Sequence, residues 1–153
     1  MKKIIIGSDH AGFELKEELK AYLIHSGFKV EDVGAHSPER CDYPGIASNL
    51  AAQVSSGKFR RGILICYTGI GNSIVANRFS RIRAALCYNL KAARLAREHN
   101  DSNVLVLGAA FIGKTLAKRI TRVWLKTGFV GQRHKRRIKQ IEKIGECLRE
   151  KNN

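Results

Sequence analysis

Short apolar runs that alternate with longer amphipathic stretches restrict the folds open to this sequence. The runs IIIG at 4–7, GILIC at 62–66 and NVLVLG at 103–108 are apolar and sharply bounded, which is typical of buried strands. Because such runs alternate with helical patterns, we predict an α/β fold with a parallel sheet covered by helices on both faces. The predicted strands span 4–7, 28–34, 62–66, 82–87 and 103–108, and the predicted helices span 11–27, 46–57, a segment from about 73, 89–99, 113–126 and 134–150.

The length and the apolar content of the chain fit one folded domain. With 153 residues, of which 44% are hydrophobic, the chain can bury an ordinary core, so we expect a single domain over residues 1–153. No apolar stretch approaches the ~20 residues of a membrane span, and the start MKKIIIGSDH lacks the ~7–15-residue apolar core of a signal peptide. We therefore expect a cytoplasmic protein that does not enter a membrane.

The four cysteines, Cys41, Cys66, Cys87 and Cys147, indicate neither a metal site nor disulfides. No two of them form a CxxC or CxxH pattern, and a chain of this size does not need disulfides to fold. We expect reduced thiols and no bound metal. Three of these cysteines give no sign of a function, and Cys66 is the candidate for a reactive thiol.

The charge balance is strongly basic, with 28 lysine and arginine residues against 13 acidic residues and a net charge of +15. Such a surplus favours nucleic acid, acidic lipid or phosphorylated metabolites as partners, and charge alone does not choose among them. Much of it lies in RHKRRIK at 133–139, a run typical of a solvated face or an interaction patch. Arg133 and Arg137, however, are four residues apart and share one helical face, which would suit a phosphate clamp.

Polar residues gather in sequence around the ends of the predicted strands. Ligands of parallel α/β sheets bind at the carboxyl ends of the strands, so we expect a site where these residues meet. The residues that we expect there are Ser8, Asp9 and His10 after the first strand, Cys66, Tyr67, Thr68, Gly69, Gly71, Asn72 and Ser73 after the third, and His99, Asn100, Asp101 and Asn103 before the fifth.

The segment TGIGNS at 68–73 has features of a loop that binds an anion. Gly69 and Gly71 allow a tight turn and a close approach to a ligand, and a helix that begins near Ser73 would direct its free N–H groups to the same place. The same groups would lower the pKa of Cys66 if its sulfur faces them. A thiolate in such a place can remove a proton next to a carbonyl while the amides hold the enediolate.

Ordinary structural roles would explain several of these residues equally well. A cysteine at a strand end is often a small buried hydrophobe, and a single GxG is a weak signal. His10 and His99 could equally be surface residues. Ser8 or Asp9 could be the cap of the following helix. Taken one at a time, these residues do not establish a function.

Five segments in order along the chain resemble those of a known family. They are GSDHAGFELK at 7–16, DYP at 42–44, ILICYTGIGNSIVANR at 63–78, REHNDSNVLVLGA at 97–109 and GQRHKRRIKQI at 131–141. With these segments the sequence resembles the ribose-5-phosphate isomerase B family, which includes the galactose-6-phosphate isomerase subunits. The resemblance implies a Rossmann-like three-layer α/β/α sandwich with a five-stranded parallel sheet and an extra C-terminal helix. It also implies a cofactor-independent aldose–ketose isomerase that interconverts ribose 5-phosphate and ribulose 5-phosphate through a cis-enediol.

The resemblance also implies roles for individual residues. Cys66 matches the family's proton-transferring base, and the amides of the Gly69–Ser73 loop match its oxyanion donors. Members that use a glutamate carry it at the position of Asn72, so this sequence falls in the cysteine group. The other matches are Asp9, Thr68 and His99 for ring opening and holding hydroxyls, His10, Arg133 and Arg137 for the phosphate, and Tyr43 and Asn100 for lining the substrate.

The family is dimeric or tetrameric and shares its active site between subunits, so His99 and Asn100 would serve the neighbouring chain. The sequence departs from the family at Tyr67, where glycine is usual, and at Ala110, where arginine is frequent. These departures leave open a six-carbon sugar phosphate as the substrate. A nucleic-acid-binding module is less favoured, because the basic C-terminal segment lacks interleaved aromatic residues and no zinc-finger or RNP-type pattern is present.

Overall fold

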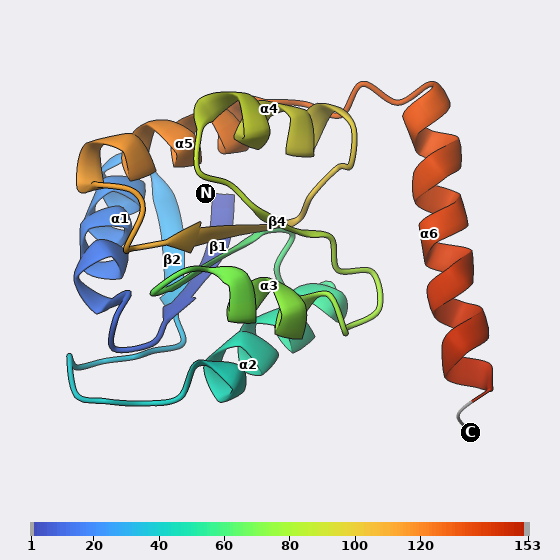
Figure 1. Ribbon diagram of the computed structural model, residues 1–153. Coiled ribbons are helices and arrows are strands. Elements are labelled where there is room, and N and C mark those ends of the chain that lie inside the picture. The colour runs from blue at the N-terminus through green and yellow to red at the C-terminus, as the bar shows by residue number, and fades with distance from the viewer. Residues whose placement is uncertain (1, 152–153) are drawn as a thin grey trace.

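The computed structural model describes residues 2–151 and contains one parallel sheet of five strands in the order β2-β1-β3-β5-β4 (Figure 1). The predicted α/β fold is thereby confirmed. The strands are β1 (Lys2–Ser8), β2 (Phe28–Asp32), β3 (Gly62–Cys66), β4 (Ala84–Leu86) and β5 (Val104–Gly108). The helices are α1 (Phe13–His25), α2 (Tyr43–Ser55), α3 (Ile70–Ala76), α4 (Leu90–Glu98), α5 (Lys114–Lys126) and α6 (Arg133–Glu150).

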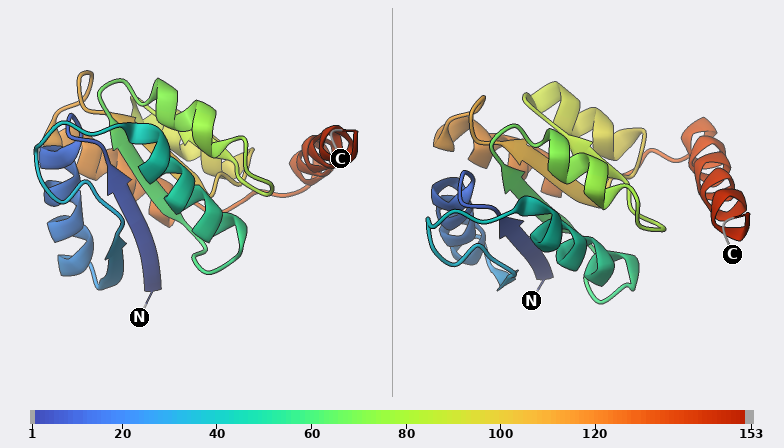
Figure 2. Two further views of the ribbon diagram at one scale, coloured as in Figure 1. Left: turned by 90° about the horizontal axis from the view of Figure 1, so that it is seen from below. Right: turned by 60° about the horizontal axis from the view of Figure 1, so that its bottom comes forward.

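Two apolar cores hold the helices against the two faces of the sheet. The central strands β3 and β5 are buried throughout, so successive side chains feed both cores. One core joins α1, α4 and α5 to the sheet, and the other joins α2 and α3 to it, which gives the three layers visible in Figures 1 and 2. Representative residues are Leu19, Ala93, Ile120 and Trp124 in the first core, and Leu50, Ala51, Leu64 and Val106 in the second.

Several element boundaries differ from those predicted, for local reasons. Helix α2 begins at Tyr43 rather than at 46, because Pro44 lies in its first turn, where a proline costs no hydrogen bond. Helix α3 begins at Ile70 rather than near Ser73, and Gly69 precedes it in a left-handed conformation. Strand β4 spans only Ala84–Leu86, so the predicted strand at 82–87 was too long.

Helix α6 lies apart from the three layers (Figures 1 and 2). Its links to the rest of the chain include an ion pair between Arg83 and Glu142 at 2.7 Å and a stacked pair of rings, His99 and His134, with centroids 4.2 Å apart. Within residues 2–151, no helix has both the length and the apolar composition that a bilayer span requires.

A buried ion pair joins α1 to the end of β2. Lys16 has a fully buried side chain, and its Nζ lies 2.5 Å from Oδ2 of Asp32. Burial alone would raise the pKa of Asp32, but hydrogen bonds from Lys16, Lys20 and the N–H of Gly34 bring it below its ordinary value. Because this pKa is depressed in the folded state, the stabilisation is present above the unfolded value, near 4 for aspartate, and is lost as the pH falls through the folded pKa.

We expect Asp32→Asn to lower the free energy of unfolding at neutral pH by about 1–3 kcal/mol, because it removes one of the two carboxylates that pair with the buried Lys16 ammonium and leaves Glu17, at 2.6 Å, as the other. Urea denaturation at pH 7 and at about pH 2.5 would measure this, and the difference between wild type and variant should shrink at the lower pH, where Asp32 takes up a proton. Glu31→Gln, at the exposed neighbouring position, is the matched control. A loss below about 1 kcal/mol would show that the pair contributes little.

Candidate active site

Cys66 ends the central strand β3, and its thiol is buried near the carboxyl-terminal edge of the sheet. The chain turns back toward the sulfur directly after the strand, so the backbone N–H of Gly69 donates to Sγ at 3.2 Å. Gly69 has φ of +81°, and a Cβ at this position would lie 2.4 Å from Cδ1 of Leu86. Only glycine fits this turn, and the turn brings backbone donors to the thiol.

The pKa of Cys66 shifts in the opposite direction from the one that the sequence suggested. Burial raises the pKa of the thiol, and the negative charge of Asp9 adds to the increase. Backbone N–H groups of Asn72, Gly69 and Thr68 lower it, but they do not outweigh burial. The N–H groups thus lower the pKa as predicted, but the net shift is upward because burial outweighs them. The raised pKa favours the protonated thiol over the thiolate, and it makes the thiolate a stronger base.

Asp9 and His10 follow β1 and bring a carboxylate and an imidazole to the same edge. The charge of Asp9 acts on Cys66, and its Oδ1 accepts the N–H of Gly12 at 3.0 Å. This bond closes the turn before α1, whose N-cap residue is Gly12, so Asp9 is not the helix cap that the sequence suggested. The bond uses one of its two carboxylate oxygens. Nδ1 of His10 lies 3.0 Å from the carbonyl oxygen of Cys41, a contact that fixes the ring.

Tyr43 and Asn72 come from the α2–α3 side of the sheet. The ring of Tyr43 lies so close to Gly71 that a Cβ there would be 2.4 Å from its Cζ, so this glycine is needed for the tyrosine as well as for any ligand. Asn72 is 1% exposed, and neither polar atom of its side chain has a hydrogen-bond partner among residues 2–151. Because buried polar groups are nearly always paired, this amide is suited to a hydroxyl group of a ligand.

The backbone N–H groups of the Gly69–Ser73 loop are not all available to a ligand. Gly69 donates to Cys66, Ile70 donates to Oγ1 of Thr68 at 3.2 Å, and Ser73 donates to the carbonyl of Gly69 at 3.1 Å. The N–H groups of Gly71 and Asn72 remain, and that of Asn72 also acts on the Cys66 thiol. The expected set of oxyanion donors is therefore smaller than the loop sequence indicated.

Tyr88 is a residue of this site that the sequence did not single out. Its hydroxyl donates to the carbonyl of Thr68 at 2.9 Å, and its ring packs edge-on against Phe111. Its position just after β4, at the carboxyl edge, is the signal that would have found it.

Tyr67 is 64% exposed, so its ring does not pack under the Gly69–Ser73 loop. Its carbonyl oxygen accepts the N–H of Ala110 at 2.9 Å.

His99 and Asn100 lie at the other edge of the sheet, and Arg133 and Arg137 lie at the start of α6, next to the His134 ring that stacks on His99. Gly62 pairs with Val104 in the parallel register, so residues just before β5 stand beside the start of β3, roughly 13 Å along that strand from Cys66. The expectation that these residues gather with Cys66 is therefore wrong within one chain. A residue that precedes a parallel strand lies at the edge opposite to one that follows a strand.

The residues at this amino-terminal edge form a basic group of their own. His99 stacks on His134, the second residue of α6. Burial lowers the pKa of His134, and the positive charges of His99, Arg133 and Arg137 lower it further. The start of α6 thus gathers two imidazoles and two guanidinium groups, a set suited to an anion.

We expect the buried cysteines to resist alkylation at neutral pH, because burial raises the pKa of Cys66 and raises that of Cys87 to about 11. Each pH unit below a thiol pKa lowers its reactive thiolate about tenfold. Iodoacetamide treatment with peptide mass mapping should modify the exposed Cys147 first and Cys87 last, and the rate at Cys66 should rise into the alkaline range. Alkylation of Cys66 as fast as that of Cys147 at pH 7 would contradict the raised pKa.

The residues at the carboxyl edge include a thiol, a carboxylate, an imidazole and amide donors. Such a set can move a proton at a carbon next to a carbonyl and hold the charge that develops on oxygen. Among residues 2–151, no group of three histidine, cysteine or acidic side chains is placed to hold a metal ion.

Comparison with known proteins places this arrangement in a family. The model of the ribose/galactose isomerase family matches residues 4–141. Ribose-5-phosphate isomerase B of Escherichia coli is 48% identical over 144 residues, which are 94% of this chain and 97% of that protein. The structure of Clostridium thermocellum ribose-5-phosphate isomerase B superimposes with a TM-score of 0.94 at 46% identity, covering 95% of this chain and 99% of the other.

A further relative carries a different activity in its name. The 4-deoxy-4-sulfo-D-erythrose isomerase of Clostridium sp. is 44% identical over 128 residues, which are 83% of this chain and 80% of that protein. The sequence resemblance is thus confirmed by the family model, by the relatives and by the solved structure. The chain belongs to the ribose/galactose isomerase family.

Proposed function

We propose that this protein interconverts ribose 5-phosphate and ribulose 5-phosphate, with Cys66 as the base that moves the proton between C2 and C1. The observation that carries the proposal is the buried thiol at the end of β3, which faces the backbone N–H groups of Gly69 and of Asn72, a residue whose buried side-chain amide has no partner among residues 2–151. The named activity of the Escherichia coli and Clostridium thermocellum relatives supports this substrate.

The raised pKa of Cys66 suits a base that acts on carbon. The thiolate takes the proton from C2 of the open-chain aldose, and the C1 carbonyl oxygen gains negative charge as the enediolate forms. The N–H groups of Gly71 and Asn72 would stabilise that charge. The thiol then returns the proton to C1, and the proton of the C2 hydroxyl passes to the C1 oxygen, so that C1 carries a hydroxyl and the C2 oxygen becomes the carbonyl. A stronger base favours the first step, and the small fraction of thiolate at neutral pH opposes it.

The remaining residues take the roles that the family implies. Asp9 and Thr68 lie with Cys66 and would open the furanose ring, and His10 would contact the phosphate. His99 and Asn100 lie at the opposite edge, and Arg133 and Arg137 lie at the start of α6, so their own chain cannot bring them to this thiol. We therefore propose that a second copy supplies them, which makes the active site a property of a homo-oligomer.

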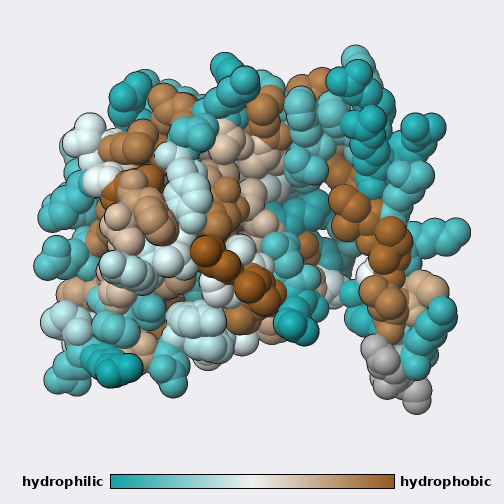
Figure 3. Space-filling view, viewed as in Figure 1, coloured by the Kyte–Doolittle hydropathy of each residue, from teal (hydrophilic) through white to brown (hydrophobic). Residues whose placement is uncertain are grey.

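Two exposed apolar surfaces fit such an assembly. Ile141 and Ile144 form a stripe on α6, and Ile70 and Ile74 of α3 lie in the open beside Tyr67 and the active-site loop. Figure 3 shows apolar residues along α6 and over α3 on one side of the molecule. In a two-fold dimer, α6 of each copy would cover α3 of the other and carry its basic residues toward the partner's thiol.

The test of the function is the turnover of sugar phosphates of different length, measured with EDTA present. We expect ribose 5-phosphate to be converted with a kcat/KM at least about tenfold above that for allose 6-phosphate and for galactose 6-phosphate. The six-carbon sugars remain the second candidate because Tyr67 and Ala110 depart from the family pattern at the edge of the site. Faster turnover of a six-carbon phosphate would transfer the assignment to it.

An assay with 4-deoxy-4-sulfo-D-erythrose, the sugar in the name of the Clostridium sp. relative, tests whether the enzyme recognises a phosphate or a sulfonate group. We expect no turnover of 4-deoxy-4-sulfo-D-erythrose, and a preference for it would replace the proposed substrate. Inactivity on all of these sugars would contradict the proposed reaction.

Phosphorylated pentoses are retained in the cytoplasm, where we propose that the enzyme works.

A further inference from the structure

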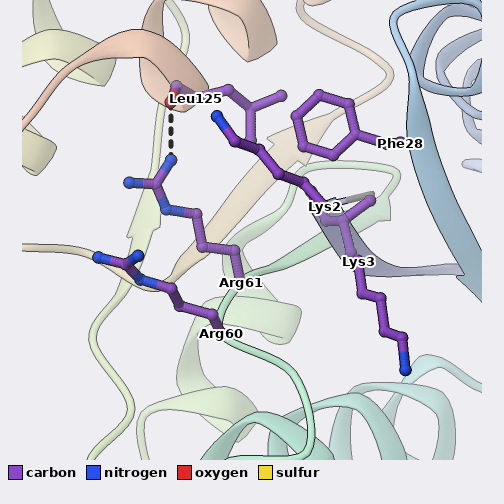
Figure 4. Close-up of a pocket in the computed structure, with 7 residues that line it drawn as sticks. Lys2, Lys3, Phe28, Arg60, Arg61 and Leu125 are labelled. Atoms are coloured by element: carbon purple, nitrogen blue, oxygen red, sulfur yellow. Dashed lines mark hydrogen bonds between the residues drawn. The ribbon is translucent and has the colours of Figure 1, made fainter.

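A basic cavity lies at the amino-terminal edge of the sheet, away from Cys66. It has a volume of about 260 Å³, and the residues that line it come from the starts of β1 and β2, from the loop before β3 and from the end of α5. Figure 4 shows most of these side chains. The lining residues are Lys2, Lys3, Ile4, Phe28, Arg60, Arg61 and Leu125.

The cavity carries positive charge that the surrounding protein does not neutralise. None of the described residues that line it is acidic, and within residues 2–151 Lys2 and Arg60 form no ion pair. A neighbouring hollow of about 210 Å³ shares Arg60 and Arg61 and adds Arg83 and Arg97. Asp101 is its acidic lining residue, and it already pairs with Arg97 at 2.8 Å.

Arg61 is held rigidly between these two hollows. Its Nη1 donates to the carbonyl of Leu125 at 2.8 Å, and its guanidinium lies over the ring of Trp124, 5.3 Å from the centroid. Burial, followed by the positive charges of Arg97 and Arg60, lowers the pKa of Arg61 to about 10. Figure 4 shows Arg60 beside Arg61 and the amino group of Lys2 near Leu125, whereas Lys3 points away from them.

Like charges that are held together in a partly buried place destabilise one another unless an anion joins them. A phosphate group fits this need, because guanidinium groups bind its oxygens in pairs and an ammonium adds a further charge. The apolar part of the lining, Ile4, Phe28 and Leu125, offers a surface for the non-phosphate part of a ligand.

We propose that this cavity binds a phosphorylated small molecule with a flat or apolar group, such as a nucleoside diphosphate, with its phosphates at Lys2, Arg60 and Arg61 and its apolar group on Phe28 and Leu125. The cavity differs from the site proposed for the sugar phosphate, which is built around Cys66 at the other edge of the sheet and takes Arg133 and Arg137 from a second copy. The proposal holds whichever sugar the enzyme converts, because its test measures binding and not turnover.

Isothermal titration of the purified protein with ADP and with inorganic pyrophosphate, at about 50 mM and about 200 mM salt, tests the proposal. We expect both to bind with a dissociation constant below about 1 mM, and ADP to bind more tightly than pyrophosphate. Arg60→Ala should weaken both at least about tenfold. Arg119→Ala, at an exposed position on α5, removes the same charge and should leave binding unchanged.

Phosphates can also enter the proposed isomerase site, so Arg137→Ala serves as the second control. Binding that survives Arg60→Ala but is lost in Arg137→Ala would assign the anion to the isomerase site and overturn the proposal. Absence of binding by the assembled protein would overturn it too. A third result would also overturn the proposal: binding of a single-stranded oligonucleotide that depends equally on Arg60 and Arg119 and weakens steeply as the salt concentration rises. Such binding would indicate a diffuse basic surface.

Discussion

Replacing Cys66 by alanine is expected to lower kcat for ribose 5-phosphate by at least about a thousandfold. Cys87 also follows a strand at the carboxyl edge, but burial raises its pKa to about 11. Asn72 stands where a glutamate would be needed to replace Cys66. Cys66→Ser should lose almost as much activity, because a hydroxyl of similar size is a far weaker acid and forms almost no alkoxide at neutral pH. Substrate affinity should change much less than kcat, because the thiol acts mainly in the transition state.

The comparison needs folded variants and a control at another thiol. Circular dichroism melts would show whether the variants fold, and Cys147→Ala, at an exposed position far along α6, should keep the activity of the wild type. Assays with EDTA present keep adventitious metal ions from contributing. Activity of Cys66→Ser within about tenfold of wild type would remove the thiol as the base.

The sequence was sufficient to predict the strands of the sheet and their parallel arrangement. The reason is that β3 and β5 are buried on both faces and therefore appear as unbroken apolar runs. Residues directly after strands, such as Asp9 and Cys66, could be placed at one edge on the same basis. The separation of α6 from the sheet could not be predicted, because its exposed Ile141 and Ile144 look like core positions of an ordinary amphipathic helix.

The parts of the site that the sequence did not predict depend on contacts between distant segments. The pKa of Cys66 depends on how deeply the thiol is buried, and the amide pattern of the loop does not reveal that depth. The need for Gly71 comes from Tyr43, 28 positions earlier in the chain. His99 was grouped with Cys66 because both lie next to strands, although one precedes its strand and the other follows it.

A second large effect is expected when two inactive variants share a dimer. His99 lies at the opposite edge from the thiol of its own chain, so each site of the proposed dimer takes Cys66 from one copy and His99 from the other. A mixed dimer of Cys66→Ala and His99→Gln would then contain one site with both natural residues. With random pairing, half of the dimers are mixed and each has one intact site of two, so about a quarter of wild-type activity should return.

The activity of mixed subunits tests most directly whether two copies build one active site. The two variants would be unfolded and refolded together, with each variant refolded alone as the baseline and gel filtration to confirm the dimer. We predict that the mixture of the two single variants recovers about a quarter of wild-type activity. When wild type is refolded with an equal amount of the double variant, we predict that the activity of the mixture falls to about a quarter, and not to a half, of that of the same total amount of wild type. No recovery in the first mixture, together with half of the activity in the second, would show that each chain contains its whole site and would contradict the shared one.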